Sequence, residues 1–485
     1  MKRLILILGI LILFIHPIDG HSKAKYHVII DTDCGLDDLR AITIMLASTE
    51  FEVLAITTSD GVLAPLDGLK NVRSLLNSYG HQGIPTGAGI QHLRQPPVYR
   101  KYAEAVSWGE PFAVSTEDSD NAFDLIIREL ENEEKPVILI TLGSMTTYAT
   151  LLKAKPDLLR ELEKILWVDG GTNRKSGFNY LLDTISAKYV LARDIPIVTV
   201  LRNETTNLSM DDDFLKTSSM GNSRYINHLR SVFTSLPGSS VHSGMMNICD
   251  ELLPVFLLDS INFTRFSGSS VYGNHTYYPE RIYAIKELMR QVLLEEKEDQ
   301  SIVFNTFPSE SDMFLEDVAP MTEKIIARHG RKEWKIVVMT NEFHEHLGIY
   351  SIIGAKMGLR IREYFTIGID EVTITSYAGS IPPVSCMNDG LQVSTGATLG
   401  HGTIHIAPDH SLPMADFSFK DKTVRCKLKK EFRDCITNEI RNAVNEFGLN
   451  TDGYWIKIRQ LALKYWMELD RNDIFEISVL PAVTK

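Results

Sequence analysis

The sequence predicts an α/β protein: an open, mostly parallel sheet with helices on both faces, followed by a smaller α+β C-terminal domain. Three observations predict this. Short β-branched apolar runs alternate with helical patterns from residue 26 to about residue 200, turn-forming residues bound each run, and the composition becomes polar and turn-rich after about residue 295. Such alternation is typical of parallel strands joined by crossover helices, because each helix carries the chain back across a face of the sheet.

The strands and helices of the first domain follow from this alternation. Short apolar runs between turn residues are typical of buried strands, and apolar residues spaced three and four apart are typical of helices. The expected strands are 26–30, 53–57, 137–142, 165–168 and 195–200. The expected helices are 39–48, 65–79, 121–131, 146–152 and 184–192.

The loops after the strands are the expected place for chemistry. Ligands of open parallel sheets bind beyond the carboxyl ends of the strands. Here these loops are rich in Asp, Gly, Thr and Asn, which offer carboxylate, hydroxyl and amide groups. The loops concerned are 31–38, 59–61, 143–146, 169–173 and 202–206.

A domain junction is expected between about residues 300 and 333, where charged residues and turn formers interrupt the apolar pattern. We divide the chain into a signal peptide (1–24), a first domain (25–305), a linker (306–333) and a second domain (334–485). In the second domain a strand-like segment begins at Trp334, and a helix (349–364), a strand (371–376) and a long helix (451–469) follow.

Composition excludes several classes of protein. Apolar residues make up 44% and charged residues 23%, which is globular composition and argues against a disordered chain. The 50 basic and 62 acidic residues give 50 − 62 = −12, so the chain is a poor candidate for sequence-independent nucleic-acid binding, which requires a basic surface. Five cysteines in so long a chain do not form a disulfide framework.

The N-terminal residues indicate targeting. Lys2 and Arg3 precede an apolar run of about a dozen residues (4–15), and Pro17 and Gly20 follow. The run is shorter than the roughly 20 residues that cross a bilayer, which is typical of a cleaved signal peptide. We therefore expect an exported protein, periplasmic or secreted, without a stable membrane anchor. The alternative is an uncleaved N-terminal anchor.

Four carboxylates within eight residues form the first candidate site. Asp31, Asp33, Asp37 and Asp38 follow a buried strand, and Gly35 is expected to make the sharp turn that brings them together. Two like charges 4 Å apart repel by about 4 kcal/mol at an effective dielectric of 20, so a cation is expected, and oxygen ligands select Ca²⁺ or Mg²⁺. The alternative places Asp37 and Asp38 merely in the first helical turn, which leaves Asp31 and Asp33 unexplained.

The segment 31–38 resembles the Asp-x-Asp-x-Gly-x-Asp-Asp signature of the nucleoside hydrolases, the inosine–uridine-preferring N-ribohydrolase family. The resemblance extends over roughly residues 25 to 300. It implies a nucleoside hydrolase-like fold and a Ca²⁺-dependent hydrolase of N-glycosyl bonds, which converts ribonucleosides or related ribosides to ribose and free base. Further matching segments are 55–58, 84–88, 142–147, 169–171, 178–179 and 249–253.

The resemblance also implies roles for individual residues. Asp33 would be both a Ca²⁺ ligand and the general base. The other implied positions are the metal ligands Asp38, Thr146 (through its carbonyl) and Asp250, with Asp31 just behind the metal, and the sugar contacts Asp37, Asn179 and Asp250.

The sequence departs from the family where the leaving group would bind. Cys249 stands where the family carries His, Gly177 where it carries Glu, and Val62 where it carries Asn. A thiol is a weak hydrogen-bond donor, so we expect a preference for substrates with good leaving groups. His242, on the loop before Asp250, is a second candidate donor of the proton; the alternative for His242 is a solvated loop histidine.

A second candidate site lies in the C-terminal domain. His344 and His346, two residues apart, and the remote Cys386 could supply three Zn²⁺ ligands; the alternative is a Gly-rich turn region with surface histidines. Residues 334–482 resemble one of the subunit families of formylmethanofuran dehydrogenase, with matching Asp389 and Gln392 but without two of that family's cysteines, since Gly348 and Ala397 replace them. This resemblance implies a metal-binding fold with His344, His346 and Cys386 as candidate ligands.

The sequence therefore favours an exported Ca²⁺-dependent N-glycosidase fused to a metal-binding accessory domain. Its expected partner is a small-molecule nucleoside or riboside, and homo-oligomerisation is left open. The first alternative is a non-catalytic riboside-binding protein, which would keep the diol-binding acids but would not need the base Asp33. A third reading places the activity in the C-terminal domain.

Overall fold

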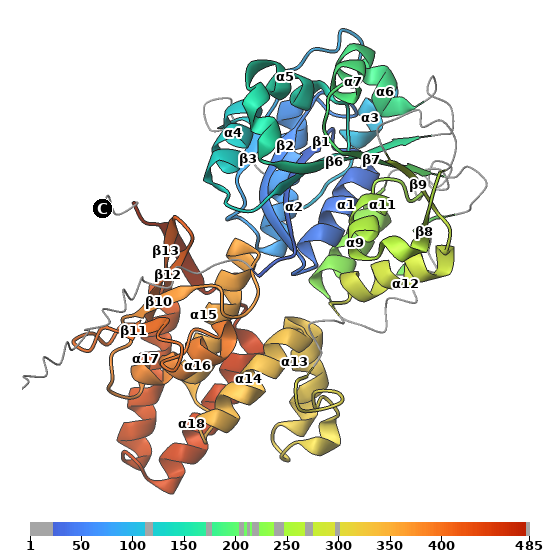
Figure 1. Ribbon diagram of the computed structural model, residues 1–485. Coiled ribbons are helices and arrows are strands. Elements are labelled where there is room, and N and C mark those ends of the chain that lie inside the picture. The colour runs from blue at the N-terminus through green and yellow to red at the C-terminus, as the bar shows by residue number, and fades with distance from the viewer. Residues whose placement is uncertain are drawn as a thin grey trace, which may run out of the picture.

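The computed structural model describes residues 23–111, 120–170, 177–202, 208–210, 214–215, 223–236, 247–266, 275–295 and 301–481. In this part of the chain a nine-stranded sheet and a five-stranded sheet form two separate domains, one above the other in Figure 1. The predicted division into a larger N-terminal α/β unit and a smaller C-terminal unit is confirmed. No helix among the described residues is both long and apolar enough to span a membrane.

The nine-stranded sheet has the order β4-β3-β2-β1-β5-β6-β7-β9-β8. All neighbouring strands pair in parallel except β8 and β9, which are antiparallel. The mostly parallel sheet is therefore confirmed. The strands are β1 (Tyr26–Thr32), β2 (Phe51–Thr58), β3 (Thr86–Ala88), β4 (Asp120–Asn121), β5 (Val137–Thr141), β6 (Leu162–Gly170), β7 (Ile197–Arg202), β8 (Phe263–Arg265) and β9 (His275–Pro279).

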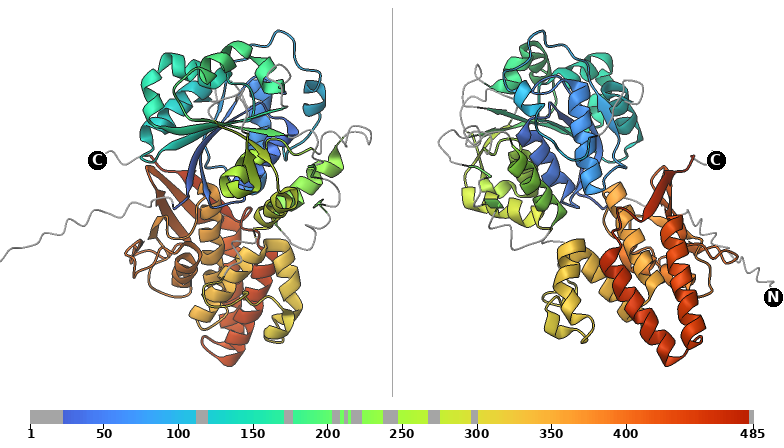
Figure 2. Two further views of the ribbon diagram at one scale, coloured as in Figure 1. Left: turned by 45° about the vertical axis from the view of Figure 1, so that its right-hand side comes forward. Right: turned by 180° about the vertical axis from the view of Figure 1, so that it is seen from behind.

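Helices cover both faces of this sheet, as Figures 1 and 2 show. Val28 and Ile30 belong to the core on one face and Ile29 to the core on the other, because successive side chains of a strand point to opposite faces. The core with Ile30 includes residues of α1 (Leu36–Leu46), α2 (Pro65–Tyr79), α9 (Arg224–Ser235), α11 (Leu252–Leu258) and α12 (Ile282–Leu293). The core with Ile29 includes residues of α4 (Ala122–Asn132), α5 (Thr146–Ala154) and α7 (Thr184–Leu191).

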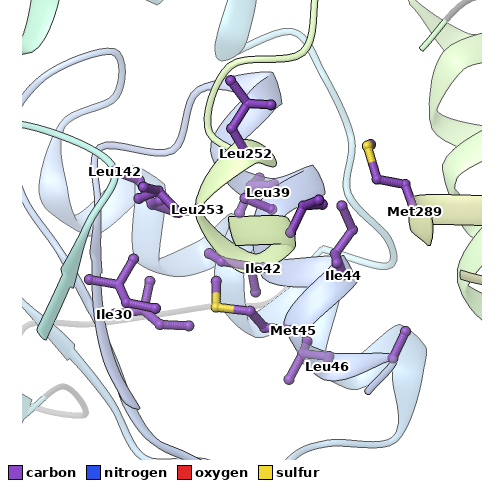
Figure 3. Packing of buried hydrophobic residues seen from close by; sticks show 14 of the residues in the cluster. Ile30, Leu39, Ile42, Ile44, Met45, Leu46, Leu142, Leu252, Leu253 and Met289 are labelled. Carbon is purple, nitrogen blue, oxygen red and sulfur yellow. The ribbon is translucent and has the colours of Figure 1, made fainter. Parts of the chain in front are cut away.

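The packing of α11 against α1 positions two of the predicted site residues. Leu252 and Leu253 of α11 lie beside Leu39 of α1 in the buried cluster of Figure 3. Leu39 directly follows Asp38, and Leu252 comes two residues after Asp250. Because these apolar side chains are fully buried, their contact draws together acids that are far apart in the sequence.

The second domain combines a mixed sheet with a helical layer. Its sheet has the order β11-β10-β12-β13-β14, and only β10 and β11 pair in parallel. The strands are β10 (Thr373–Ser376), β11 (Ile404–Ile406), β12 (Met414–Phe419), β13 (Lys422–Leu428) and β14 (Phe475–Val479). The helices are α13 (Thr322–His329), α14 (Arg331–Phe343), α15 (Ile349–Phe365), α16 (Met387–Thr395), α17 (Lys430–Phe447) and α18 (Asp452–Glu468).

Helix α15 is the buried centre of the second domain, and α16 lies directly against it. A Cβ at Gly354 would lie 2.1 Å from the carbonyl oxygen of Met387, and one at Gly390 would lie 2.2 Å from that of Ser351. Both positions therefore need glycine, because the two helix backbones touch there. This contact places Cys386, which directly precedes α16, near the start of α15.

The structure differs from the sequence prediction at the start of the second domain. The strand-like segment at Trp334 is part of helix α14, whose buried residues Trp334, Val337 and Asn341 recur at helical spacing. Residues 306–333, expected as a linker, pack as part of the second domain. Val318 and Ile325 belong to its core, and Trp334 Nε1 donates a hydrogen bond to the Pro308 carbonyl over 3.0 Å.

The two domains meet through buried polar contacts. Arg360 of α15 donates to the carbonyl of Gly80 over 2.8 Å, and Gly83 N–H donates to the carbonyl of Tyr364 over 3.1 Å. His81 Nδ1 lies 2.6 Å from the backbone carbonyl oxygen of Glu363. The side-chain carboxylate of Glu363 forms an ion pair with Arg224. These contacts join the end of α2 to the end of α15.

Candidate functional site

The loop between β1 and α1 turns at Cys34, not at Gly35 as predicted. Cys34 is buried and has φ 63°, in the left-handed region, and its N–H donates to Thr32 Oγ1 over 2.9 Å. Gly35 has φ −62°, which any residue adopts. A Cβ there would lie 2.7 Å from Asp38 Oδ2 and 2.9 Å from Asp37 Oδ1, so a side chain at residue 35 would displace these carboxylates.

Three carboxylates converge at the carboxyl-end edge of the sheet. Asp37, Asp38 and Asp250 each offer one oxygen, and these oxygens all lie within 4.8 Å of one another. Asp38 and Asp250 are almost fully buried. Asp38 and Asp250 were predicted as metal ligands, and Asp37 as a sugar contact; the structure brings all three together. Their donor set consists of oxygen alone, which fits a hard divalent ion.

Asp33 lies beside this group, held by the loop after β2. Its side chain is 2% exposed, and Oδ2 accepts a hydrogen bond from Val62 N–H over 3.1 Å. Asp33 N–H in turn donates to Asp38 Oδ1 over 3.2 Å. A Cβ at Gly61 would lie 2.0 Å from Asp33 Oδ2, so the loop approaches this carboxylate as only glycine allows.

Burial and mutual repulsion raise the pKa values of these acids. Burial raises the pKa of Asp33 and of Asp250 well above their usual range, and neighbouring carboxylates raise both further. Burial, with the Asp37 charge nearby, raises the pKa of Asp38 to about 6. Ionised carboxylates packed this closely are costly without a counter-charge, and a divalent cation would provide one. The residues therefore fit a bound metal ion.

Asp31, at the end of β1, is held by the neighbouring strand β2. It is fully buried, and its Oδ1 accepts a hydrogen bond from Thr57 Oγ1 over 2.6 Å. Burial raises its pKa to about 7. Among the described residues, the group of acids close enough to share an ion includes neither Asp31 nor Asp33. The place of Asp31 behind the metal and the metal contact of Asp33 therefore remain predictions.

The other predicted residues lie at neighbouring strand ends. Asn179 is buried and donates through Nδ2 to the carbonyls of Leu142 and Val168, over 2.8 and 3.2 Å. The carbonyl of Thr146 accepts the Thr150 hydroxyl over 2.9 Å within α5. The sugar contact of Asn179 and the metal contact of Thr146 remain predictions. His242 lies outside the described residues.

The position of the expected family glutamate is closed by another acid. A Cβ at Gly177 would lie 1.9 Å from Asp169 Oδ2 and 2.1 Å from Oδ1. The carboxylate of Asp169, 1% exposed, therefore occupies the space that a side chain at residue 177 would need. Asp169 would have to move before residue 177 could carry a side chain.

The sequence prediction did not single out Asp60, Arg100 and Tyr99. Asp60 is fully buried and accepts a hydrogen bond from Arg100 Nη2 over 2.7 Å; Arg100 also donates to the carbonyl of Gly61 over 2.6 Å. Tyr99 packs edge to face on Phe178, with 6.3 Å between ring centroids. The acidic loop at 59–61 was a signal for Asp60, whereas exposed aromatic side chains on loops follow no sequence pattern.

The second predicted site lines a cavity of about 450 Å³ in the C-terminal domain. His344 Nδ1 lies 2.6 Å from Asp389 Oδ2, and the hydrogen bonds with Asp389 and Cys386 raise the pKa of His344 to about 9. The His346 ring lies 4.1 Å from the His344 ring between centroids. Among the described residues, the two groups close enough to share one ion do not include these three predicted ligands. Zinc at this site therefore remains a prediction.

Comparison with family models assigns both parts of the chain. Residues 28–315 match the model of the inosine-uridine preferring nucleoside hydrolases. Residues 343–475 match the model described as FmdE, of the molybdenum formylmethanofuran dehydrogenase operon. Both resemblances expected from the sequence are confirmed.

Curated relatives match a part of the first domain. The chain is 31% identical over 183 residues to an uncharacterized protein of Schizosaccharomyces pombe, which covers 35% of this chain and 59% of that protein. It is 30% identical over 181 residues to a pyrimidine-specific ribonucleoside hydrolase of Citrobacter koseri, which covers 35% and 58%. The chain thus spans less than two thirds of the length of these relatives.

Solved structures resemble the first domain at low identity. A plant nucleoside hydrolase matches with 19% identity and a TM-score of 0.48, over 56% of this chain and 99% of that one. A purine-preferring ribonucleoside hydrolase of Gardnerella vaginalis matches with 18% identity and a TM-score of 0.45, over the same shares of the two chains.

Proposed function

The chain belongs to the inosine-uridine preferring nucleoside hydrolase family, and from this premise we propose that it hydrolyses the N-glycosidic bond of ribonucleosides or related ribosides. The products would be ribose and the free base or other leaving group. One observation carries the proposal: the carboxylates of Asp37, Asp38 and Asp250 converge beside the buried Asp33.

Calcium is the proposed ion of this site. Asp38 and Asp250 would hold it, and Asp37 lies close enough to contribute. Asp33, whose backbone N–H donates to Asp38 Oδ1, is proposed as a further ligand. Carboxylate oxygens suit Ca²⁺, and no histidine or cysteine belongs to this group of described residues. When bound, the ion would orient the ribose diol and lower the pKa of a water molecule.

Asp33 is proposed as the general base. Its Oδ2 is fixed by Val62 N–H, so the carboxylate has one defined orientation. Cleavage of an N-glycosidic bond passes through a cation-like ribosyl group, and the surrounding anionic side chains stabilise that charge more in the transition state than in the ground state. Asp33 would accept the proton of the attacking water, while Asp37 and Asp250 bind ribose hydroxyls.

The leaving group is proposed to be one that departs without strong acid assistance. Cys249 replaces the family's histidine, and Asp169 fills the space where the family carries glutamate. Tyr99 and Phe178 adjoin the site residues Arg100 and Asn179, and their rings are partly exposed. They would offer an aromatic surface for a planar leaving group.

A non-catalytic riboside-binding protein is the second candidate function. Gly177 favours it, because glycine has no side chain with which to contact a leaving group. Such a protein would bind the sugar through the same acids but would release nothing. Activity measurements distinguish the two functions directly.

For the second domain we propose an accessory metal-binding role, with Zn²⁺ held by His344, His346 and Cys386. The cavity of about 450 Å³ that these residues line supports it, as does the hydrogen bond between His344 and Asp389, since metal-binding histidines usually donate their other N–H to a carboxylate. We also propose export, on the signal-peptide pattern of residues 1–24.

The test is release of ribose from a panel of purine and pyrimidine nucleosides and p-nitrophenyl riboside. The full chain is assayed with Ca²⁺, with a chelator, and with Ca²⁺ restored, and Asp33→Asn serves as the matched control. Turnover that requires both Ca²⁺ and Asp33 supports the hydrolase. Saturable binding of ribosides without any turnover supports the binding protein instead.

A further inference from the structure

A second group of potential metal ligands lies at the amino ends of the central strands β1 and β2, whereas the proposed active site lies at the carboxyl ends. It consists of His27, Glu52 and Glu133, whose ligand atoms all lie within 4.8 Å of one another. His27 is near the start of β1 and pairs in register with Glu52 of β2, and Glu133 directly follows α4. Asp31 lies four positions after His27 along β1, which is about 13 Å at 3.3 Å per residue, so this group is separate from the carboxylates of the proposed active site.

The distances within the group match a metal site. His27 Nδ1 lies 3.2 Å from Glu52 Oε2 and 3.3 Å from Glu133 Oε1. Ligand atoms of a tetrahedral ion with bonds of about 2.0–2.1 Å lie about 3.3 Å apart. The two distances from His27 Nδ1 therefore agree with this spacing, and the two carboxylate oxygens lie within 4.8 Å of each other.

His27 provides a second observation. It is 3% exposed, and its Nδ1 lies at ion-pair distance from both glutamates, without the geometry of a good hydrogen bond to either. Its Nε2 has no hydrogen-bond partner among the described residues. Buried polar atoms are almost always well paired, so an ion bound between His27 Nδ1 and the two carboxylates would satisfy all three groups better than their direct contacts do.

Lys420 of the second domain holds the same two glutamates from the other side. Its Nζ lies 2.5 Å from Glu52 Oε1 and 2.6 Å from Glu133 Oε2, the oxygens that face away from His27. Each carboxylate thus has one oxygen fixed by Lys420 and the other directed toward His27. The pairing orients both carboxylates and joins the group to the turn between β12 and β13.

We propose that His27 Nδ1, Glu52 Oε2 and Glu133 Oε1 bind a Zn²⁺-class ion, with water in the fourth position, and that Lys420 supports the site from the second domain. Imidazole nitrogen with carboxylate oxygens suits Zn²⁺ better than the hard ions of the all-carboxylate group. Bound there, the ion would link the start of β1, the start of β2 and the end of α4, and Lys420 would connect them to the second domain.

The test removes all metal from the full chain and then measures how much Zn²⁺ it binds and how tightly. All variants carry Cys386→Ser, which removes one predicted ligand of the C-terminal site, and excess Ca²⁺ fills the first site. We expect the Cys386→Ser protein to bind one equivalent of Zn²⁺. His27→Gln and Glu133→Gln should each weaken the zinc affinity about 100-fold. Lys420→Met should keep the zinc affinity within about tenfold, since Lys420 donates no metal ligand. Circular dichroism verifies that each variant is folded.

X-ray absorption of the bound zinc provides the second readout. The proposed site predicts one imidazole and only oxygen otherwise, and Zn²⁺ should raise the melting temperature of the Cys386→Ser protein but not that of its His27→Gln form. Unchanged zinc affinity in both folded ligand variants would overturn the proposal. If the Glu133→Gln variant does not fold, the zinc affinity of the His27→Gln variant decides the question.

Discussion

The backbone N–H of Val62 donates to Asp33 Oδ2 over 3.1 Å, so the loop after β2 holds the carboxylate that we propose as the general base. Gly61 makes this possible, because any side chain there would collide with Asp33. The base is therefore oriented by backbone, which a substitution of Asp33 does not disturb.

Asp33→Asn is expected to abolish most of the turnover while the protein remains folded. The amide keeps the size of the side chain, and its oxygen can still accept from Val62 N–H, but it cannot accept a proton from water. General base catalysis contributes about 10²–10⁴-fold, so kcat should fall by that order. Steady-state kinetics with thermal melting checks this, and Asp33→Asn activity within tenfold of the unaltered protein would contradict the assignment.

Calcium is expected to stabilise the fold through Asp38 and Asp250. Binding to the folded state alone stabilises by about 2.7 kcal/mol at a concentration 100 times the dissociation constant. Melting curves with and without Ca²⁺ should therefore separate for the unaltered chain and coincide for the Asp38→Asn/Asp250→Asn double variant. A calcium shift that persists in the double variant would place the ion elsewhere.

Cys249→His is expected to accelerate cleavage of inosine selectively. The thiol is a weak donor, whereas imidazolium can protonate a departing purine. The unaltered chain should therefore prefer p-nitrophenyl riboside over inosine in kcat/KM, and Cys249→His should narrow that ratio by about 10²-fold if the histidine acts as a general acid. Cys249→Ser is the matched control. Equal kcat/KM values for the two substrates in the unaltered chain would show that another group already supplies the proton.

Acid is expected to weaken the domain contact at His81. Burial, with Arg224 nearby, lowers the pKa of His81 to about 3, below its ordinary 6.5. The folded state thus prefers neutral His81, so its stability is complete above pH 6.5 and is lost as the pH falls from 6.5 toward 3. At pH 5 the loss is about 2 kcal/mol.

Chemical denaturation between pH 7.5 and 4.5 tests this, with His81→Gln as control. The glutamine does not titrate, so its unfolding free energy should fall less steeply with pH than that of the unaltered chain. Other acids contribute equally to both curves. Two parallel curves would show that His81 does not set the acid response.

Local patterns made much of the fold predictable. Strand β1 and helix α2 appear where the apolar periodicity placed them, because a two-residue or 3.6-residue repeat depends only on neighbours in the sequence. The prediction that a strand starts at Trp334 was wrong, because the apolar run there is too short to distinguish the two-residue repeat of a strand from the 3.6-residue repeat of a helix. The segment 306–333 reads as polar but packs through isolated apolar residues such as Ile325.

The sequence by itself determined the acidic loop after β1, because its carboxylates lie within eight residues and their crowding follows from chain connectivity. Tertiary structure alone decided that Asp250 joins Asp38, that Asp169 fills the space at Gly177, and that Lys420 reaches Glu52 and Glu133. Those distances depend on how buried helices and strands pack, to within an ångström, and no repeat in the sequence records that packing.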